Sequence, residues 1–271
     1  MFQIRQNKEI IWLEVQAIKQ TEKVIHAFST RLGGVSQFPY RSLNLGLYTN
    51  DDENDVIENR KRFLRPFSVD PNCVATVKQI HSDKIVRVDE NFMANPFLQK
   101  IENCLEADAL ITNKKGIALF VNYADCVPLI ILDPKKEAIA AVHAGWRGTL
   151  KGIGAKVVKE MISQFDSSPE DIIVAIGPSI GPLDFEIGLD VIEEIKQHYP
   201  TYTELLVPSR ENHAYFDIWL ANEWQLQSVG IKKENIHLAR LSTMKRNDLF
   251  FSHRKSLLGE TGRMGTFIML T

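Results

Sequence analysis

The sequence predicts an α/β or α+β fold with a mixed β-sheet, organised as a single domain over residues 1–271. Two observations predict the fold: short, apolar, β-rich runs joined by turns dominate the middle of the chain, and strands alternate with helices in the second half. A third observation concerns organisation. We find no internal repeat, low-complexity tract or Gly/Ser-rich linker that would divide the 271 residues.

The composition narrows the class of protein. The chain is 44% hydrophobic and 24% charged, as in ordinary globular proteins. Its net charge of −2 gives no electrostatic footprint for nucleic acid. The N-terminus lacks a signal-peptide core, and the longest apolar run, residues 127–132, is too short to span a bilayer. Because the three cysteines show no CxxC spacing, we expect a reduced, cytoplasmic protein without a disulfide framework.

In the first half we expect mainly strands. Residues 29–36 form a glycine-rich loop that carries Arg31, and such a loop offers backbone N–H groups and a guanidinium to an anion, although a plain glycine turn remains an alternative. Residues 51–64 predict a helix, because acidic residues begin it and basic residues end it. Residues 89–104 are expected to form an irregular loop. Strands are predicted over residues 10–15, 24–28, 73–80, 85–88, 106–112 and 116–121.

In the second half of the chain, predicted helices alternate with predicted strands. Apolar residues at helical spacing predict a helix over residues 148–165, and the Gly-Pro sequences at 177–182 predict a rigid turn. Further helices are expected over residues 189–198 and 216–229. Strands are expected over residues 127–132, 137–143, 172–176, 236–241 and 265–270.

One predicted hairpin places two reactive side chains together. If residues 133–136 form a four-residue loop, Leu132 pairs with Glu137 and Cys126 lies opposite His143. Directly opposed residues share a face, with Cβ atoms roughly 4.5–5.5 Å apart. A thiol and an imidazole held in this way could share a metal ion, or could form a nucleophile–base pair. A buried structural cysteine beside a satisfied histidine is the third interpretation.

Other candidates lie at the ends of predicted strands. His81 occupies a turn after a strand, where a side chain can project into a pocket. Asp108 lies near the head of the strand at 106–112, and Asp125 directly precedes Cys126. The glycine-flanked Trp146 and Arg147 follow His143.

Eight blocks of sequence stand out, in order from about residue 24 to the C-terminus. They are Phe28-Ser-Thr-Arg-Leu-Gly-Gly34, Leu43-Asn-Leu-Gly46, Lys78-Gln-Ile-His-Ser82, Glu106-Ala-Asp-Ala-Leu110, Ala124-Asp-Cys-Val-Pro-Leu129, Val142-His-Ala-Gly-Trp-Arg-Gly148, Gly177-Pro-Ser-Ile-Gly181 and Phe250-Phe-Ser-His-Arg254. Together these blocks resemble the YfiH family, also called laccase-domain or polyphenol oxidase proteins, which includes the YlmD proteins. The resemblance implies a single α/β domain with layered sheets flanked by helices, related in architecture to the cytotoxic necrotizing factor deamidases. It also implies a metal site formed by His81, Cys126 and His143.

The resemblance implies two kinds of activity. One is multicopper polyphenol oxidation. The other is purine nucleoside chemistry, namely phosphorolysis of adenosine, inosine, guanosine and S-methyl-5′-thioadenosine, and deamination of adenosine to inosine. Many members carry a cysteine where this chain has Ser179, so a catalytic thiol in that turn is excluded here.

The residues favour nucleoside chemistry with zinc. Seven histidines without an HxH pair cannot build a trinuclear copper cluster beside the predicted triad. Three protein ligands with an open fourth position are typical of catalytic zinc, which activates water as in the nucleobase deaminases. We expect Asp125 or Asp108 to move the proton, with Cys126 in the metal site. We expect Arg31, Arg147 and Asn44 to bind phosphate or substrate, so the partners are purine nucleosides and phosphate.

Three alternatives remain open at this point. A cysteine hydrolase or deamidase would use Cys126 as nucleophile and His143 as base. A copper-dependent polyphenol oxidoreductase would use the same three ligands for copper. A scaffold or metal-storage protein would need a partner surface, and we predict no protein, nucleic-acid or membrane partner.

Overall fold

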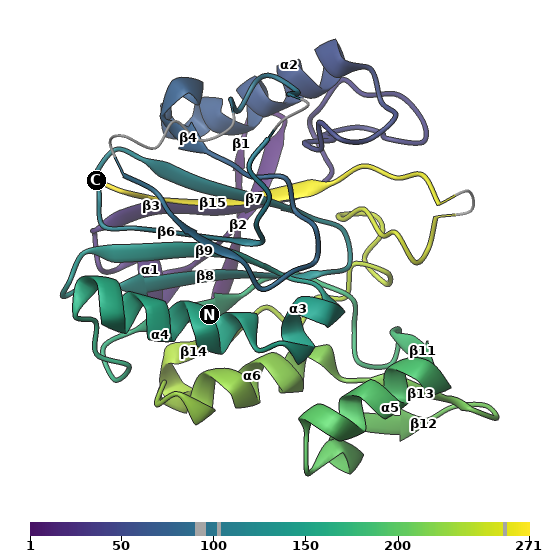
Figure 1. Cartoon of the computed structure of the whole chain (residues 1–271). Coiled ribbons are helices and arrows are strands. Elements are labelled where there is room, and N and C mark those ends of the chain that lie inside the picture. The colour runs from purple at the N-terminus through teal and green to yellow at the C-terminus, as the bar shows by residue number, and fades with distance from the viewer. Residues whose placement is uncertain (90–95, 102–103, 257–258) are drawn as a thin grey trace.

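The computed structural model describes residues 1–89, 96–101, 104–256 and 259–271 (Figure 1). Short 3₁₀ helices cover Arg65–Phe67, Pro71–Cys73, Tyr202–Glu204 and Lys233–Asn235. The α-helices are α1 (Gln16–Lys19), α2 (Glu53–Leu64), α3 (Trp146–Leu150), α4 (Ile153–Phe165), α5 (Leu189–His198) and α6 (Ile218–Ser228). The strands are β1 (Phe2–Asn7), β2 (Ile10–Val15), β3 (Val24–Ser29), β4 (Val74–Ala75), β5 (Ile85–Arg87), β6 (Ala109–Thr112), β7 (Ala118–Tyr123), β8 (Val127–Asp133), β9 (Ala138–Ala144), β10 (Ile173–Ile176), β11 (Glu186–Gly188), β12 (Leu206–Pro208), β13 (His213–Phe216), β14 (Ile236–Leu238) and β15 (Met264–Leu270).

Two mixed sheets stack face to face and form the centre of the molecule. The first sheet has the order β1-β2-β3-β15-β7-β4, and the second has the order β14-β10-β8-β9-β6-β5. Each combines antiparallel pairs with parallel ones, such as β4 with β7 and β10 with β14. Helix α2 covers the outer face of the first sheet, and α3, α4 and α6 cover the outer face of the second (Figure 1).

Strand β8 shows how the layers are held together. Its side chains alternate between two cores, as the period-2 geometry of a strand requires. Leu129 and Ile131 pack in the core beneath the helices, whereas Ile130 and Leu132 pack in the core between the two sheets. Both faces of the strand are therefore buried, which explains its continuous apolar sequence.

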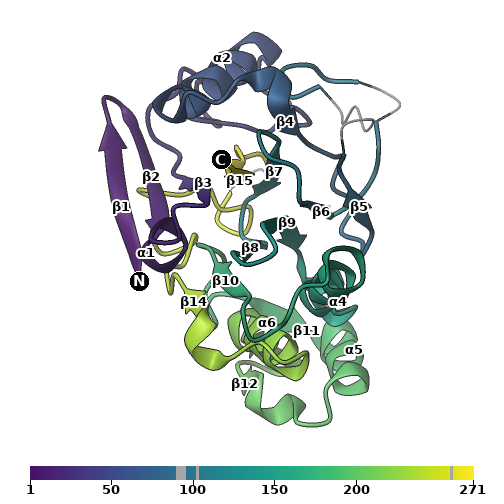
Figure 2. The ribbon, with the colours of Figure 1, turned by 90° about the vertical axis from the view of Figure 1, so that its left-hand side faces the viewer.

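A third, small sheet lies outside these layers. It consists of β11, β13 and β12, and it packs with α5 below α6 (Figure 1). At the other side of the molecule, the β1–β2 hairpin forms the edge of the first sheet (Figure 2). The sequence predicted neither β1 nor the small sheet, because their strands are short or partly exposed and lack a clear alternation.

Most predicted elements are confirmed, and the mixed α/β architecture with layered sheets flanked by helices is present. Helix 189–198 has the predicted bounds. The predicted helix 148–165 is two helices, because Gly152 adopts a left-handed conformation (φ 76°) between α3 and α4. The predicted strand 73–80 shortens to the two residues of β4. The loop predicted over 89–104 lies partly outside the described residues.

The predicted register of the β8–β9 hairpin is wrong. Asp133 pairs with Ala138, and Pro128, not Cys126, lies opposite His143. The loop is residues 134–137, because Asp133 accepts hydrogen bonds from the backbone N–H groups of Lys135 and Lys136 and thereby begins the turn. Each residue therefore pairs two positions further along the opposite strand than expected. A shift of two preserves the face of every side chain.

None of the helices in the described part of the chain is long and apolar enough to cross a membrane.

Candidate metal centre

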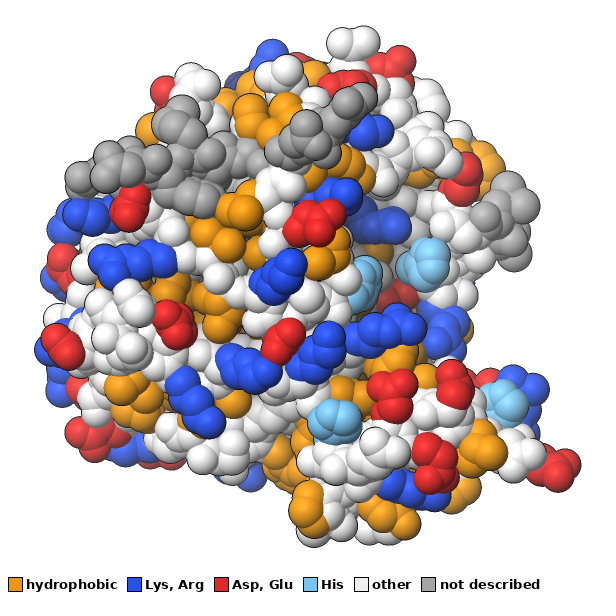
Figure 3. Space-filling model, in the orientation of Figure 1, with side chains coloured by type: hydrophobic (Ala, Val, Ile, Leu, Met, Phe, Trp, Pro, Cys, Tyr) orange, Lys and Arg blue, Asp and Glu red, His pale blue; other side chains and the backbone are white. Residues whose placement is uncertain are grey.

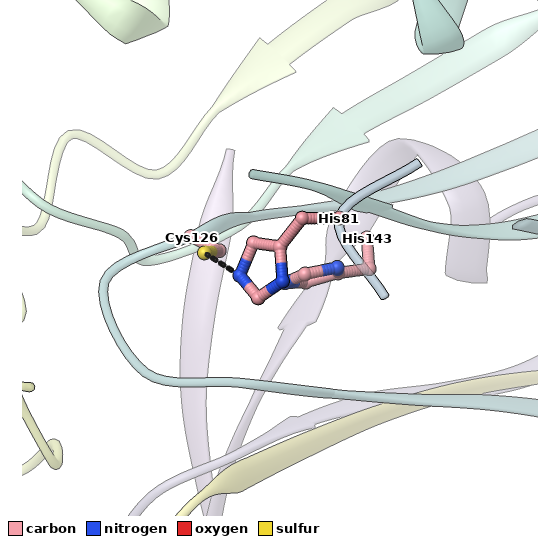
Figure 4. A group of neighbouring side chains, drawn as sticks. All are labelled: His81, Cys126 and His143. Carbon is pink, nitrogen blue, oxygen red and sulfur yellow. Dashed lines mark hydrogen bonds between the residues drawn. The ribbon is translucent and has the colours of Figure 1, made fainter. Parts of the chain in front are cut away.

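Three chain segments bring His81, Cys126 and His143 together (Figure 4). His143 lies near the end of β9, Cys126 directly precedes β8, and His81 lies in the turn before β5. Their potential ligand atoms all lie within 4.8 Å of one another, and Sγ of Cys126 is 3.8 Å from Nε2 of His81. The rings of the two histidines meet edge to face, with centroids 4.9 Å apart. The described residues contain no other cluster of this kind.

Asp108 fixes the orientation of His143. Its carboxylate is completely buried, and Oδ1 lies 2.8 Å from Nδ1 of His143. The backbone carbonyl of Asp108 also accepts the N–H of His143. With Nδ1 engaged, Nε2 is left for the cluster, which is the arrangement that metal-ligating histidines usually adopt.

The same carboxylate holds the turn that carries His81. It accepts the backbone N–H groups of Ile80, His81 and Ser82, and the hydroxyl of Ser82. This anchoring maintains His81 in a left-handed conformation (φ 59°), which is costly for a residue other than glycine. Asp108 therefore positions both histidines and lines neither of the cavities described below.

Cys126 has the electrostatic surroundings of a thiolate. Burial alone would raise its pKa, but His143 and His81 outweigh burial and lower the pKa of Cys126 to about 6. In turn, burial disfavours the charged form of His143, yet Cys126 and Asp108 raise its pKa to about 9. A thiolate is the form of cysteine that binds a metal or attacks an electrophile.

Gly145 leaves room for this cluster. A Cβ atom at this position would lie 2.8 Å from Cδ2 of His81 and 3.3 Å from Sγ of Cys126. The backbone angles of Gly145 suit any residue, so conformation does not require a glycine here. The lack of space beside the three ligands does.

Asp125 ties the cluster to a distant part of the chain. Its carboxylate accepts hydrogen bonds from the hydroxyls of Thr243 (2.5 Å) and Ser252 (3.1 Å) and from the backbone N–H of Arg254 (2.7 Å). Asp125 itself has a positive φ of 78°, directly before Cys126. The carboxylate thus holds the segment that carries His253 against the cluster.

A first cavity of about 420 Å³ opens onto the cluster. This volume lies within the range of small-molecule sites. His81, Cys126 and His143 form part of its wall, and Tyr48, Tyr123, Gln79 and Asn122 add aromatic and amide groups. The buried Arg60 and the largely buried Arg263 also line it; their guanidinium groups donate to backbone carbonyls, including those of Leu45 and Thr261.

A second cavity, of about 480 Å³, lies against the same cluster. It shares His81, Ala124, Cys126 and His253 with the first cavity. Its own wall contains Arg147, Arg254 and Asp125. The Arg147 guanidinium stacks on Trp146 at 4.2 Å, and no hydrogen bond of this side chain is found within the described residues. On the face shown in Figure 3, histidine side chains reach the surface beside lysines and arginines.

Arg31 and Asn44 lie in neither cavity. The Arg31 guanidinium donates to the backbone carbonyls of Arg41 and Asn247 and stacks on Phe251, and it borders a separate, open depression. Asn44 is completely buried, and its side chain bonds to Thr49, Asp51, Gly46 and the backbone of Arg263. The Asn44 contacts hold Gly46, Thr49 and Arg263, which line the first cavity, whereas the Arg31 contacts lie at the separate depression.

Several cavity residues were absent from the predicted site, namely Tyr48, Arg60, Gln79, Asn122, His253, Arg254 and Arg263. Lys78-Gln-Ile-His-Ser82 and Phe250-Phe-Ser-His-Arg254 contain three of them and were already recognised as family blocks, so the signal was present. Ser179 has a structural contact instead: it accepts the indole N–H of Trp219 at 2.7 Å and lines neither cavity.

The donor set fits a single metal ion. Two imidazoles and a thiolate are ligands for zinc or copper, and donor atoms that all lie within 4.8 Å of one another are close enough for His81, Cys126 and His143 to share one ion. The Asp108 carboxylate behind His143 is the outer partner that such a site needs.

The chain is similar to known proteins over most of its length. The family described as multi-copper polyphenol oxidoreductase laccase matches residues 25–271. Purine nucleoside phosphorylase YlmD of Bacillus subtilis is 33% identical over 254 residues, covering 93% of this chain and 91% of that protein. A protein named adenosine deaminase RL5, from an unknown prokaryotic organism, is 33% identical over 249 residues, covering 91% and 94%.

A solved structure extends the similarity to three dimensions. The hypothetical protein YfiH of Bacillus licheniformis has a TM-score of 0.92 and 32% identity, covering 99% of both chains. The chain therefore belongs to the multi-copper polyphenol oxidoreductase laccase family, in which its relatives include YfiH and YlmD proteins.

Proposed function

We propose that this protein is a zinc-dependent purine nucleoside enzyme, with residues 1–271 forming one catalytic domain. Its main reaction is phosphorolysis of adenosine, inosine, guanosine and S-methyl-5′-thioadenosine to the free base and the ribose 1-phosphate. Deamination of adenosine to inosine is the second reaction. The observation that carries the proposal is the meeting of two cavities at one His-Cys-His cluster. The names of the relatives support the choice of substrates.

The first cavity suits the nucleoside. Its volume accommodates a small molecule, the exposed Tyr48 offers aromatic surface to a base, and the amides of Gln79 and Asn122 form a polar part of the wall. The side chain of Gln79 donates to the backbone carbonyl of Asn122 and accepts its backbone N–H, which fixes the Gln79 amide before a ligand arrives.

The second cavity suits phosphate. Arg147 presents a guanidinium without a protein acceptor in the described structure, and guanidinium is the side-chain group that binds phosphate in a bidentate manner. We assign phosphate binding to Arg147. Arg31 and Asn44, which we expected to share this task, are given structural roles instead: Arg31 joins the segments of Arg41 and Asn247, and Asn44 holds the loop at Gly46 and Arg263 beside the first cavity.

His81, Cys126 and His143 would hold zinc. When bound, zinc supplies a Lewis acid that polarises an oxygen ligand at neutral pH. The chain's own residues do the rest: Asp108 orients both imidazoles, and Asp125 fixes the wall shared by the cavities. Because both carboxylates are saturated with hydrogen-bond donors, we assign them positioning roles instead of the proton transfer that we expected from the sequence.

Product analysis tests the proposal. Purified protein of measured zinc content would be incubated with adenosine, with and without inorganic phosphate. Adenine and ribose 1-phosphate formed only with phosphate, together with inosine formed in either condition, are the expected products. Neither product from protein with one zinc per chain would overturn the nucleoside proposal. Oxidation of a phenolic substrate by the copper-loaded protein alone would favour the polyphenol oxidoreductase.

A cysteine hydrolase is the second candidate, and the low pKa of Cys126 beside His143 favours it. A thiolate bound to zinc is not available as a nucleophile, so the two functions exclude one another. We expect iodoacetamide to alkylate Cys126 only after zinc has been removed by a chelator, with the exposed Cys73 reacting in both conditions as the internal control. Equal reaction of Cys126 before chelation would favour the hydrolase.

A further inference from the structure

His253 lies where the two cavities join. It lines both of them, together with His81, Ala124 and Cys126. Its side chain is exposed, and no hydrogen bond or ion pair of its imidazole is found among the described residues. His81 and Cys126 belong to the cluster, so His253 is the titratable side chain at this junction that has no other task.

The backbone on either side of His253 is anchored. Ser252 donates its hydroxyl to Asp125, and Arg254 donates its backbone N–H to the same carboxylate oxygen. The Arg254 guanidinium also donates to the backbone carbonyl of Glu186 at 2.7 Å and stacks on Phe185. The imidazole therefore extends from a fixed backbone, and its own ring is free to contact a ligand.

The other proton-carrying groups of the two cavities are unsuited to proton transfer near neutral pH. Burial raises the pKa of Tyr48 to about 12, and burial also raises the pKa of Tyr123 above its ordinary value. Lys78 is ion-paired with Glu106 at 3.1 Å, and arginine side chains remain protonated. The Asp125 oxygens already accept three donors. Histidine is the residue type that exchanges protons most readily at this pH.

We propose that His253 is the general acid that protonates the departing purine. This role rests on the proposed phosphorolysis. In that step a phosphate oxygen forms a bond to C1′ of the ribose while the bond from C1′ to N9 breaks. The electron pair of the broken bond passes into the purine ring, and the imidazolium of His253 donates a proton to N7, so that a neutral base leaves. His253 then regains a proton from water.

A comparison of two substrates tests this role. The base of inosine must be protonated at N7 to leave as a neutral molecule. In 7-methylguanosine N7 already carries a methyl group and the purine ring is positively charged, so its base leaves without a proton donor. We expect His253→Gln to lower kcat for inosine phosphorolysis at least about 100-fold, the range for loss of a general acid. The same variant should release 7-methylguanine within about threefold of the wild-type rate. His198→Gln, at an exposed position on α5, is the matched control and should change neither rate.

Three results would overturn the role. An unchanged rate with inosine would exclude His253 from the reaction. An equal loss with both substrates, or a loss of bound zinc, would identify a structural or metal-binding residue instead. Failure of the wild-type protein to release a base from either nucleoside in the presence of phosphate would overturn the proposed function itself. The wild-type rate therefore distinguishes failure of the proposed function from failure of the role of His253.

Discussion

The Oδ1 atom of Asp108 lies 2.8 Å from Nδ1 of His143 and also accepts the backbone N–H of His81. One buried carboxylate thus supports two of the three metal-ligand candidates. Its bonded partners, His143 foremost among them, hold the pKa of Asp108 below its usual value in spite of its burial. The cluster is consequently built as much by this residue as by its own ligands.

We expect Asp108→Asn to weaken zinc binding by about 10- to 100-fold, as is usual when the outer partner of a histidine ligand is lost. The asparagine side chain has one oxygen that accepts hydrogen bonds and one nitrogen that only donates them, so it cannot replace both carboxylate oxygens of Asp108. Competition with a chelator would measure the affinity. Asp83→Asn, in the same turn but paired with Lys156, is the control and should retain wild-type affinity. Unchanged affinity in Asp108→Asn would contradict the assignment.

Arg147→Gln should raise the KM for phosphate about 10- to 100-fold, since a charge-assisted hydrogen bond contributes about 1.5–3 kcal/mol. The KM for the nucleoside should stay within about twofold. Arg31→Gln is the matched comparison: it should leave the KM for phosphate unchanged and lower the free energy of unfolding, because its guanidinium binds backbone carbonyls. Steady-state kinetics and urea unfolding separate the two. A raised KM for phosphate in Arg31→Gln, with an unchanged KM in Arg147→Gln, would assign phosphate binding to Arg31 instead.

Gly145→Ala should lower activity roughly 10- to 100-fold, because the new methyl group displaces His81 and small displacements of catalytic groups are costly. The backbone angles of Gly145 permit alanine, so the free energy of unfolding should change little. Gly188→Ala, which replaces the glycine before α5, is the control and should retain activity. A crystal structure of the variant with His81 in its original position, or an unchanged affinity for zinc, would contradict this explanation.

His26 should make the protein less stable in acid. Its buried Nε2 accepts the backbone N–H of Val15 at 2.8 Å, and burial lowers its pKa to about 4. The unfolded chain, with a histidine pKa of about 6.5, binds more protons between pH 6.5 and pH 4. The free energy of unfolding therefore falls as the pH is lowered through this range, by roughly 2 kcal/mol from pH 7.5 to pH 5.

Urea unfolding at the two pH values measures this effect. His26→Gln retains a hydrogen-bond acceptor without a titrating group, so this contribution to the pH dependence should be lost in the variant. The same loss of stability in both proteins would exclude His26 as its source.

The sequence predicted the cluster better than it predicted the hairpin. The wrong register still placed Cys126 and His143 on one face, because the error was two residues and the side-chain period of a strand is two. The left-handed backbone of His81 and Asp125 could not be predicted, since neither residue type requires it and distant partners impose it.

The roles of the polar residues depended on tertiary contacts. Arg31 in a glycine-rich loop predicts an anion site, but the carbonyls of Arg41 and Asn247 satisfy it, and Asn247 is 216 residues away in sequence. His253 showed the opposite problem. It lies in the recognised block Phe250-Phe-Ser-His-Arg254, but its place at the cavities depends on the folding of this segment against Asp125.

The hydrogen bonds of Asp125 also bear on the order in which the protein folds. They join residues 118 to 129 positions apart, and the C-terminal strand β15 lies between β3 and β7 in the middle of its sheet. Proteins rich in contacts of long sequence separation fold slowly, because the entropy of closing long loops opposes these contacts. We expect the wall between the two cavities to be completed late in folding, so enzymatic activity should not return before the native fold is reached.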